Sequence, residues 1–346
     1  MTRRSSSITI REVAKQAGVS VATVSRYINR NAPVSQEVSG RLEQVMTDLK
    51  YIPHAAARYL ASRKTHAIGL LLTTIQNDFY VPLMKGVESV IRQKDYNLLV
   101  ATYQSDTGDN KLPPIGPHNT DGLIVYADSL SDDEMASYYA GGFPMVLIHR
   151  TSPASLPIPS VTIENKAATY KLVEHLIVHH QKRRILLMRG RAHQEDSYWR
   201  ETGYKSALEA NEIPFDPKMV LAGDFEREVA YQSLTQFLGN GMNVVFDAVF
   251  AGNDDAAIGV IKALQDNGYR VPEDISVVGF DDLRLSGFLT PPLTTVRAPT
   301  EQVGCIAAEQ LFCLIDQQHL SGVTVLPTEL IIRRSCGCHD LSMAFN

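Results

Sequence analysis

The chain has 346 residues, 44% hydrophobic and 21% charged, with a formal net charge of −5 at pH 7, which predicts two or three globular domains and excludes both a single small module and a disordered chain. No apolar run is long enough to span a membrane, and the arginines at positions 3 and 4 are not followed by the apolar core of an export signal, so we expect a cytoplasmic protein. The four cysteines are too few and too clustered for a secreted disulfide framework, and Cys336-Gly337-Cys338 lacks the second pair of a typical zinc site, so we expect reduced thiols and neither a metal nor another cofactor.

The charge is distributed unevenly along the chain. Residues 1–66 carry eleven lysines and arginines against four acidic residues, a net charge of +7, whereas the remainder carries 22 against 34, a net charge of −12. A basic head on an acidic body indicates a module that binds a polyanion. The ordinary alternative for the head is a set of solvated helix faces.

The head has the pattern of two short helices joined by a tight turn. Thr9 and Glu12 form the sequence of a capping box, the helix that begins there ends at Gly18, and Ser20 can cap a second helix that runs through Tyr27. A small residue, a turn glycine and a β-branched residue at the contact are typical of a helix-turn-helix unit. In a basic segment this favours DNA binding over a bland helical hairpin.

A third helix and a hinge follow. Ser35 is expected to cap a helix whose stripe of apolar side chains from Val38 to Leu49 closes a small core. After Pro53, an alanine-rich segment predicts a helix of at most two turns, ending near Ala61. So short a helix is marginal alone in water, and we expect it to form on contact with DNA and with a second copy in a dimer.

The body alternates short apolar runs with amphipathic stretches, as parallel strands and their crossover helices do. The predicted strands are 68–72, 98–101, 123–126, 145–148, 161–163, 185–188, 248–251 and 276–279. The predicted helices are 80–92, 166–179, 198–210, 227–238, 254–267 and 301–315. Eight buried strands are more than one doubly wound sheet of this kind needs. We therefore expect two doubly wound lobes with a binding cleft at the carboxyl ends of the strands. Three prolines and a glycine predict a loop at 111–117.

The sequence from Ile10 to Arg26, with Asn29, Val34-Ser35 and Tyr51-Ile52-Pro53, resembles the head of the lactose-repressor (LacI–GalR) family. The similarity continues through the body in motifs such as residues 77–80, 251–254 and 277–282. The resemblance implies an all-α helix-turn-helix head and an α/β body of two doubly wound parallel-sheet lobes, similar to a periplasmic binding protein.

The resemblance also implies where the domains divide. The DNA-binding domain is expected at 1–52, the hinge helix and linker at 53–65, the effector-binding and dimerisation domain at 66–337 and a tail at 338–346. One lobe is expected to comprise about 66–164 and 296–325, and the other about 165–295 and 326–337.

In the family, the second helix lies in the major groove of DNA. The positions that face base edges are here Val21, Ala22 and Arg26, and those that mostly hold phosphates are here Thr9, Ser20, Thr23, Ser25 and Asn29. The hinge leucine, here Leu60, wedges into the minor groove beside Ala57. Of these, Arg26 can contact a guanine through two hydrogen bonds, whereas valine and alanine offer only apolar contact.

A ligand set follows from the body motifs. Arg200, Asn253 and Asp281 combine donors, a two-sided amide and a carboxylate, which suit the neighbouring hydroxyls of a sugar. Phe79, Tyr80 and Phe225 supply flat faces for a sugar ring, and the family uses the corresponding positions in this way. His149 is added because it replaces a common acidic residue. The ordinary alternatives are core packing for the aromatic residues and helix capping for Asp281.

The resemblance implies a dimeric, ligand-responsive transcription regulator, expected to be a repressor that binds a pseudo-palindromic operator and responds to a sugar. A purine or a sugar phosphate is the alternative effector, and Arg189 and Arg191 suit an anion, although a solvated loop is the more ordinary interpretation. An enzyme using Asp254-Asp255 or Asp281-Asp282 lacks supporting motifs, and an exported binding protein would not need the basic head. His175, His179 and His180 lack an evident partner ligand, so surface histidines are favoured over a metal site.

Overall fold

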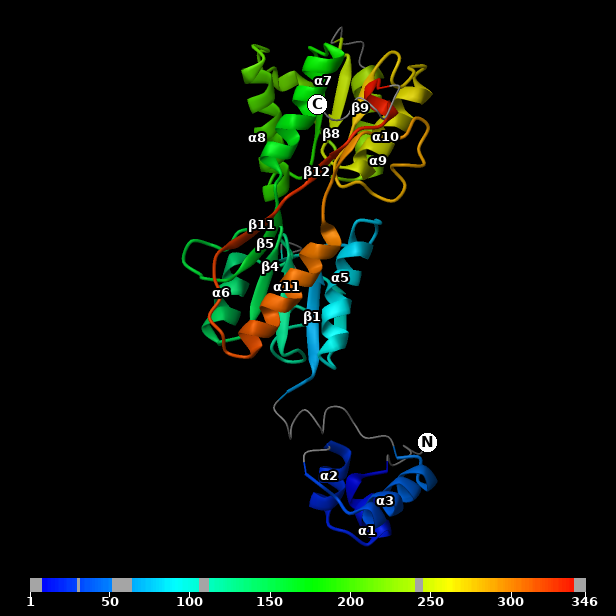
Figure 1. The fold of residues 1–346 in the computed structure, drawn as a ribbon, viewed down its shortest axis with the longest axis vertical. Coiled ribbons are helices and arrows are strands. Elements are labelled where there is room, and N and C mark those ends of the chain that lie inside the picture. Colours follow the sequence, from blue (N-terminus) through cyan, green and yellow to red (C-terminus); the bar gives the residue numbers. More distant parts are fainter. Residues whose placement is uncertain (1–7, 30–31, 52–63, 106–111, 240–244, 339–346) are drawn as a thin grey trace, which may run out of the picture. The chain divides into compact units, whose positions relative to one another are not determined.

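The computed structural model describes residues 8–29, 32–51, 64–105, 112–239 and 245–338. The chain divides into two compact units, residues 1–65 and residues 66–346 (Figure 1). The predicted hinge helix, with Ala57 and Leu60, lies outside the described residues. Within the described ranges, no helix has the length and apolar character needed to cross a membrane.

The first unit contains three helices, α1 (Ile10–Ala17), α2 (Val21–Asn29) and α3 (Gln36–Asp48). The predicted capping box is confirmed, because the backbone N–H of Glu12 donates to the Thr9 hydroxyl and the Glu12 carboxylate accepts from the backbone N–H of Thr9 at 2.8 Å. Gly18 ends α1 with a left-handed φ of 65°, as predicted. Ser20 caps α2 by accepting from the N–H of Thr23 at 3.1 Å. Ser35 stands before α3 but its side chain makes no capping hydrogen bond, so that prediction is wrong in its detail.

The core of the first unit consists of small and β-branched side chains. Val13, Ala14 and Ala17 of α1 are buried against Val24 of α2 and Leu42 of α3. The small residues let the helices approach closely around the turn at Gly18. Burial of Val24 directs the opposite face of α2 toward solvent.

The first sheet of the second unit is entirely parallel and has the strand order β11-β5-β4-β3-β1-β2. Its strands are β1 (Ala67–Leu72), β2 (Asn97–Thr102), β3 (Gly122–Tyr126), β4 (Met145–Ile148), β5 (Ser160–Ile163) and β11 (Val323–Leu326). The helices of this lobe are α5 (Tyr80–Gln93), α6 (Asp132–Ala140) and α11 (Thr300–Ile315). The central strands β1, β3 and β4 are almost wholly buried, which explains their continuous apolar sequences.

The second sheet is also parallel, with the order β7-β6-β8-β9. Its strands are β6 (Ile185–Arg189), β7 (Val220–Ala222), β8 (Ala248–Ala251) and β9 (Ser276–Val278). The helices of this lobe are α7 (Lys166–His180), α8 (Glu195–Ala210), α9 (Arg227–Gly239) and α10 (Asp254–Asp266), and short 3-10 turns lie at η2 (Pro217–Met219) and η3 (Arg334–Cys336). The two lobes therefore have the predicted doubly wound α/β architecture.

The chain passes between the two lobes at three places, after β5, before α11 and after β11 (Figure 1). Two of these passages are paired, because β10 (Thr295–Arg297) and β12 (Glu329–Ile331) form an antiparallel two-stranded sheet.

Every predicted helix and strand of the body is present, with ends shifted by at most three residues. The elements that the sequence analysis missed are α6, which buries only Met135, and the strands β7, β10, β11 and β12, which are three or four residues long. Such elements carry too few periodic apolar residues to be recognised. From residue 112 to residue 117 the proline-rich segment forms bends rather than a helix, as predicted, and Lys111 lies outside the described residues.

Candidate functional site

The exposed face of α2 carries the side chains predicted to meet DNA bases. Val21 is 42% exposed, and Ala22 and Arg26 are also exposed. Ala22 and Arg26 are each two positions from the buried Val24 and so lie on the opposite side of the helix. α2 therefore presents an apolar pair and one guanidinium on a surface that the core of the unit does not need.

The residues predicted to hold phosphates lie at helix ends or on α2. The hydroxyls of Ser20 and Thr23 lie 2.9 Å apart, and the Thr9 hydroxyl donates to the Glu12 carboxylate at 3.0 Å. Ser25 is partly buried on α2, and Asn29 is the last residue of that helix. Several of these hydroxyls thus already serve as caps in the first unit.

A pocket between the two lobes of the second unit is lined by all seven side chains of the predicted ligand set. They are Phe79, Tyr80, His149, Arg200, Phe225, Asn253 and Asp281. Four of them lie within three residues of the carboxyl end of a parallel strand: His149 after β4, Phe225 after β7, Asn253 after β8 and Asp281 after β9. The carboxyl edges of the two sheets therefore face the same space, where ligands bind in such folds.

The wall from the first lobe is aromatic. Tyr126, at the end of β3, lies edge-to-face with Tyr80 at a centroid distance of 5.3 Å and with His149 at 5.6 Å. Phe79 and Tyr80 are 8% and 5% exposed and pack edge-to-face at 5.4 Å. Edge-to-face rings are held rigidly, so this wall is a preformed apolar surface with phenol groups on it.

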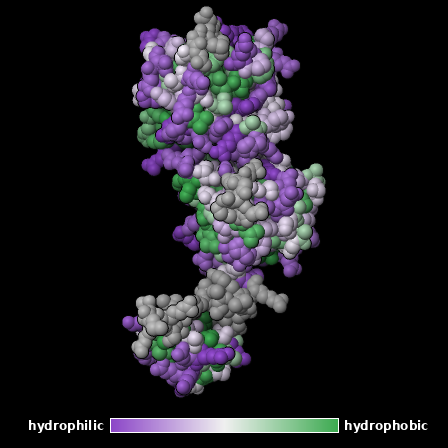
Figure 2. Space-filling model, turned by 180° about the vertical axis from the view of Figure 1, so that it is seen from behind, coloured by the Kyte–Doolittle hydropathy of each residue, from purple (hydrophilic) through white to green (hydrophobic). Residues whose placement is uncertain are grey.

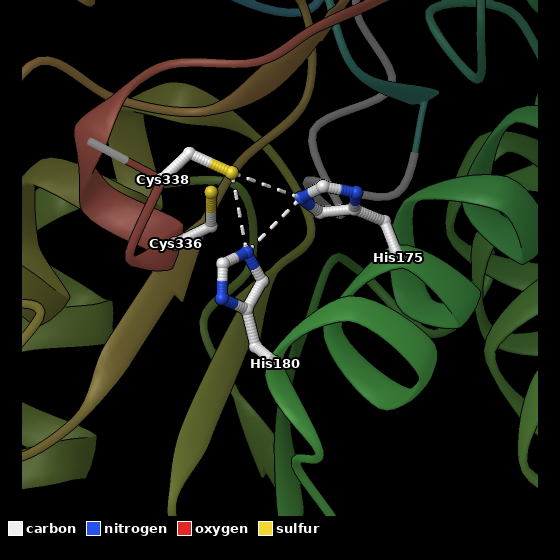
Figure 3. A group of neighbouring side chains, drawn as sticks. All are labelled: His175, His180, Cys336 and Cys338. Atoms are coloured by element: carbon white, nitrogen blue, oxygen red, sulfur yellow. Dashed lines mark hydrogen bonds between the residues drawn. The ribbon is translucent and has the colours of Figure 1, made fainter. Parts of the chain in front are cut away.

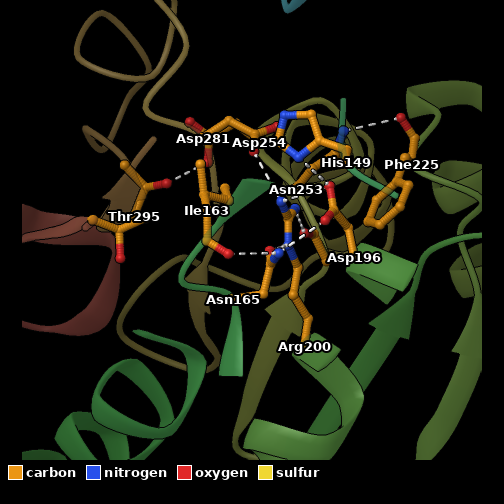
Figure 4. Close-up of polar contacts among 12 residues, drawn as sticks. His149, Ile163, Asn165, Asp196, Arg200, Phe225, Asn253, Asp254, Asp281 and Thr295 are labelled. Carbon is orange, nitrogen blue, oxygen red and sulfur yellow. Dashed lines mark hydrogen bonds and ion pairs between the residues drawn. The ribbon is translucent and has the colours of Figure 1, made fainter. Parts of the chain in front are cut away.

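Arg200, on α8, lies at the centre of the wall from the second lobe (Figure 4). Its Nε donates to Oδ1 of Asn165 at 2.9 Å and its Nη1 donates to the carbonyl of Gly252 at 2.6 Å. Its Nη2 lies 3.4 Å from Oδ1 of Asp281, and its guanidinium stacks 3.7 Å from the ring centroid of Phe280. The guanidinium is thus fixed from several directions, as a forked donor can be and a lysine cannot.

Asp196 lies one helical turn before Arg200 on α8 and is buried. Its Oδ2 is 3.0 Å from Nδ1 of His149, although the imidazole is not oriented for a hydrogen bond, and its Oδ1 accepts from Asn165 at 2.8 Å. Burial raises the pKa of Asp196, but the interactions with His149, Arg200 and Asn165 outweigh it and leave this pKa below its ordinary value. Asp196 is therefore the ionised partner of Arg200 in the pocket.

Asp281 has the opposite protonation. Burial, together with the nearby carboxylates of Asp254 and Asp196, raises its pKa to about 8 despite the favourable charge of Arg200. Burial likewise raises the pKa of Asp254 to about 7, against hydrogen bonds from Ser286, Thr295 and Leu283. A protonated Asp281 carries an O–H group, so at neutral pH it can donate to a ligand as well as accept.

Asn253 and Phe225 belong to the second lobe and contact each other. The Asn253 oxygen caps α10 by accepting from Ala256 at 2.9 Å, and its amide donates to the carbonyl of Phe225 at 3.1 Å. The ring of Phe225 lies so close to Gly190 that a Cβ built there would come within 2.1 Å of the ring. Phe225 itself has a φ of 63°, and this uncommon backbone conformation aims its ring at the pocket.

The mouth of the pocket is bridged by polar contacts between the lobes. Asp128 of the first lobe accepts from Gln194 of the second lobe at 3.0 Å and lies 2.6 Å from Nε2 of His193. Thr151 donates to Glu195 through its N–H at 2.9 Å and through its hydroxyl at 2.6 Å. These contacts can form only when the two lobes are close together, so they stabilise the closed arrangement.

Two further ion pairs lie at or beside the pocket. Arg191, on the pocket wall, donates to Glu226 at 2.5 Å. Adjacent Asp254 and Asp255 face different partners, because Asp255 accepts from Arg227 at 2.8 Å on the other side. These two carboxyls therefore do not form an acid–base pair.

The sequence analysis missed several residues of the pocket. Tyr126 and Asp196 line it, and Asn165 supports it from beneath. Tyr126 ends a predicted strand, which was a usable signal. Asp196 lies before the predicted start of α8, so the four-residue spacing to Arg200 was not evident.

Comparison with known proteins identifies both parts of the chain. Residues 9–54 match the model of bacterial regulatory proteins of the lacI family, and residues 173–336 match a periplasmic binding protein-like domain. The chain is 33% identical over 331 residues to the HTH-type transcriptional regulator RegA of Clostridium saccharobutylicum, which covers 94% of this chain and 98% of the relative. The chain belongs to the LacI family. Like its relatives, this LacI-family protein is a ligand-responsive, DNA-binding transcription regulator and not an enzyme.

Solved structures agree with this assignment over nearly the whole chain. The lac repressor dimer bound to operator and the anti-inducer ONPF is 27% identical, with a TM-score of 0.77 and coverage of 95% of this chain and 99% of that one. The complex of the transcriptional regulator CelR with cellobiose is 27% identical, with a TM-score of 0.68 and the same coverage. The LacI-family fold thus extends through both the head and the body.

Proposed function

We propose that this regulator is a repressor that binds a pseudo-palindromic operator as a dimer and changes its DNA affinity when a neutral sugar binds between its lobes. The observation that carries the proposal is the convergence of the seven predicted side chains on one pocket. The proposal assigns Phe79, Tyr80, His149, Arg200, Phe225, Asn253 and Asp281 to the ligand.

The charge balance of the pocket favours a neutral polyhydroxyl ligand. Arg200 is compensated by Asp196, Arg191 by Glu226, and Asp281 is neutral at physiological pH. An anionic ligand would have to displace one of these pairings. A sugar needs only donors and acceptors at its edge and flat apolar groups over its C–H faces, which the aromatic wall supplies.

His149 is a further candidate for hydrogen bonding to this ligand. Its Nε2 is buried and makes no hydrogen bond to any described residue. A buried imidazole nitrogen without a partner is costly, and a ligand hydroxyl would relieve that cost. His149 also contacts Asp196 of the opposite lobe, so it would report on both the ligand and closure.

The cross-lobe contacts give the proposed response a physical route. The pocket volume is about 60 Å³, room for a few water molecules, so a sugar enters only when the lobes part or when Phe225 and Arg200 move. Opening breaks the contacts of Asp128 and Thr151 across the mouth. A ligand that favours one separation of the lobes alters DNA affinity by a coupling free energy, typically about 1–3 kcal/mol.

On the DNA side, the proposal places Val21, Ala22 and Arg26 at base edges. Their exposure on α2 supports this placement, and Arg26 supplies most of the discrimination because its fork fits guanine. The other proposed DNA contacts are Thr9, Ser20, Thr23, Ser25, Asn29, Ala57 and Leu60. Ala57 and the proposed wedge Leu60 lie outside the described residues.

Dimerisation is supported by an apolar edge on the first lobe. β2 is the edge strand of its sheet, yet its Val100 is 40% exposed, and Val81 of the neighbouring α5 is 58% exposed. In Figure 2, hydrophobic residues (green) lie among hydrophilic ones (purple) on the face that this view shows. Proteins usually cover an apolar strand edge, and a second copy placed there would set two heads on a two-fold operator.

Two experiments test the proposal. Selection of duplexes from a random pool by the purified protein should enrich an inverted repeat, and its affinity should fall steeply with salt. A thermal-shift screen of neutral sugars, sugar phosphates and nucleobases should give stabilisation by a neutral sugar that also changes operator affinity. Enrichment of no inverted repeat would refute the operator proposal, and stabilisation by nucleobases or sugar phosphates alone would refute the sugar assignment.

A further inference from the structure

Two histidines and two cysteines from distant parts of the chain lie together in the second lobe (Figure 3). His175 and His180 lie in the last turns of α7, and Cys336 and Cys338 follow β12 near the end of the described chain. The sequence analysis considered the two pairs separately, because the histidines lacked an evident further ligand and the cysteines lacked a second pair. About 160 residues separate the two pairs along the chain. Their four potential ligand atoms lie within 4.8 Å of one another.

The distances among His175, His180 and Cys338 match those between neighbouring ligands of a tetrahedral metal site, and Cys336 lies within 4.8 Å of the other three ligand atoms. Around zinc, with bonds of about 2.0–2.1 Å to nitrogen and about 2.3 Å to sulfur, neighbouring ligands are about 3.3 Å apart for two nitrogens and about 3.6 Å apart for nitrogen and sulfur. The two Nε2 atoms of His175 and His180 are 3.3 Å apart. The Sγ of Cys338 is 3.3 Å from Nε2 of His180 and 3.7 Å from Nε2 of His175.

The backbone brings the two cysteines to one side. Gly337, between them, has a φ of 108°, and a Cβ built there would lie 3.2 Å from Nδ1 of His180. Only glycine fits this conformation and this approach comfortably. The segment is fixed to the sheet, because the Ser276 hydroxyl donates to the carbonyl of Cys336 at 2.9 Å and the Ser335 hydroxyl donates to the carbonyl of Val277 at 2.6 Å.

The chemistry of the four groups is that of a closed metal site. His175 and Cys338 are partly buried, and imidazole nitrogens and cysteine thiolates are the ligands that structural zinc sites use. Cys336 is fully buried, and its Sγ accepts from the Thr294 hydroxyl at 3.1 Å. Such a hydrogen bond stabilises a metal-bound thiolate and orients it.

We propose that His175, His180, Cys336 and Cys338 bind one Zn²⁺ ion, which fastens the end of α7 to the segment that follows β12. Two thiolates and two imidazoles are a typical structural zinc set. Four protein ligands leave no position for a substrate, so the ion has a structural role. The ion would link α7, which precedes β6, to the segment that follows β12. It would therefore hold the second lobe together independently of the effector pocket.

The first test measures the metal content of the full-length protein without an affinity tag, purified under reducing conditions and dialysed against a zinc buffer. We expect about one zinc per chain by mass spectrometry. The Cys338→Ser and His175→Ala variants should each retain less than about a tenth of this zinc, whereas Cys313→Ser, a cysteine outside the cluster, should retain all of it. Equal zinc in the cluster variants, or no zinc in the parent, would overturn the proposal.

The second test uses the parent protein alone, so it does not depend on whether the variants fold. Co²⁺ added to the metal-free protein should produce the intense visible bands of tetrahedral cobalt with a thiolate charge-transfer band, and Zn²⁺ should abolish them. Zinc in large excess over its Kd should raise Tm by roughly 5 °C or more. A cobalt spectrum without thiolate bands, or a Cys336–Cys338 disulfide in the reduced preparation, would exclude the site.

Discussion

The two carboxyls that flank Arg200 should respond oppositely to the same substitution. Asp281→Asn replaces a group that we expect to be neutral at pH 7, because burial raises its pKa to about 8. Asp196→Asn removes an ionised partner, because the pKa of Asp196 is lowered by His149 and Arg200. The two positions share one pocket and one chemistry, so each variant is the control for the other.

The size of the effect follows from proton binding. Between pH 5 and pH 7 the unfolded chain has released the proton of Asp281, whereas the folded protein keeps it. The parent therefore loses about 1.4 kcal/mol of unfolding free energy for each pH unit through this group. This loss begins above the unfolded pKa of about 4 and ends near the folded pKa of about 8. Asp281→Asn abolishes it, so its stability relative to the parent should rise by about 3 kcal/mol from pH 5 to pH 7.

Asp196→Asn should lower the unfolding free energy by a constant amount rather than change its dependence on pH. Asp196 is ionised in both folded and unfolded states over this range, since a lowered pKa contributes stability that is lost only in stronger acid. Removing one partner of a buried ion pair typically costs about 3–5 kcal/mol. We therefore expect this variant to be less stable than the parent by a similar amount at pH 5 and at pH 7.

Urea unfolding followed by tryptophan fluorescence is a suitable assay. Trp199 is the single tryptophan of the chain and precedes Arg200 on α8, so it reports on this lobe. Unfolding free energies would be measured at pH 5, 6 and 7 for the parent and both variants. Parallel curves for Asp281→Asn and the parent would show that Asp281 is ionised when folded, and the reasoning would fail.

Three further predictions concern binding. Gly190→Ala should displace the ring of Phe225, because the new Cβ would come within 2.1 Å of it, and should weaken effector binding at least tenfold by calorimetry. Arg26→Ala should lower the affinity for operator DNA, measured by fluorescence anisotropy, by a factor corresponding to about 1–3 kcal/mol. It should lower the affinity for random DNA much less. Arg200→Lys keeps a charge but loses most of the three hydrogen bonds and the stack on Phe280, so it should lower the free energy of unfolding by about 3 kcal/mol and abolish the effector response.

Matched variants separate these effects from general damage. Gly239→Ala has no atom within 4 Å of the new Cβ and should leave the effector affinity unchanged. Arg41 is exposed on α3, and Arg41→Ala should lower the affinity for operator DNA and for random DNA by the same factor. If Arg26→Ala also lowered both affinities equally, Arg26 would have no role in base recognition. Arg284→Lys, on an exposed loop, should behave as the parent, and an Arg200→Lys variant that keeps its effector response would contradict the placement of Arg200.

Much of the architecture is encoded locally. The capping box of Thr9 and Glu12 and the left-handed turn at Gly18 depend on residues a few positions apart. The buried strands are indicated by continuous apolar sequence. The seven pocket residues were also predictable, because the ends of parallel strands meet at one edge and the family resemblance marked those ends. The short strands β7, β10 and β12 carried no such signal.

What only the tertiary structure decided is how distant groups combine. Asp196 and His149 come from different lobes, and neither sequence neighbourhood reveals that they approach to 3.0 Å. The opposite protonation of Asp196 and Asp281 likewise depends on burial and on which charges lie nearby. The same holds for the histidines of α7 and the cysteines near the end of the chain, since long-range contacts are set by packing of whole elements, which local sequence patterns do not specify.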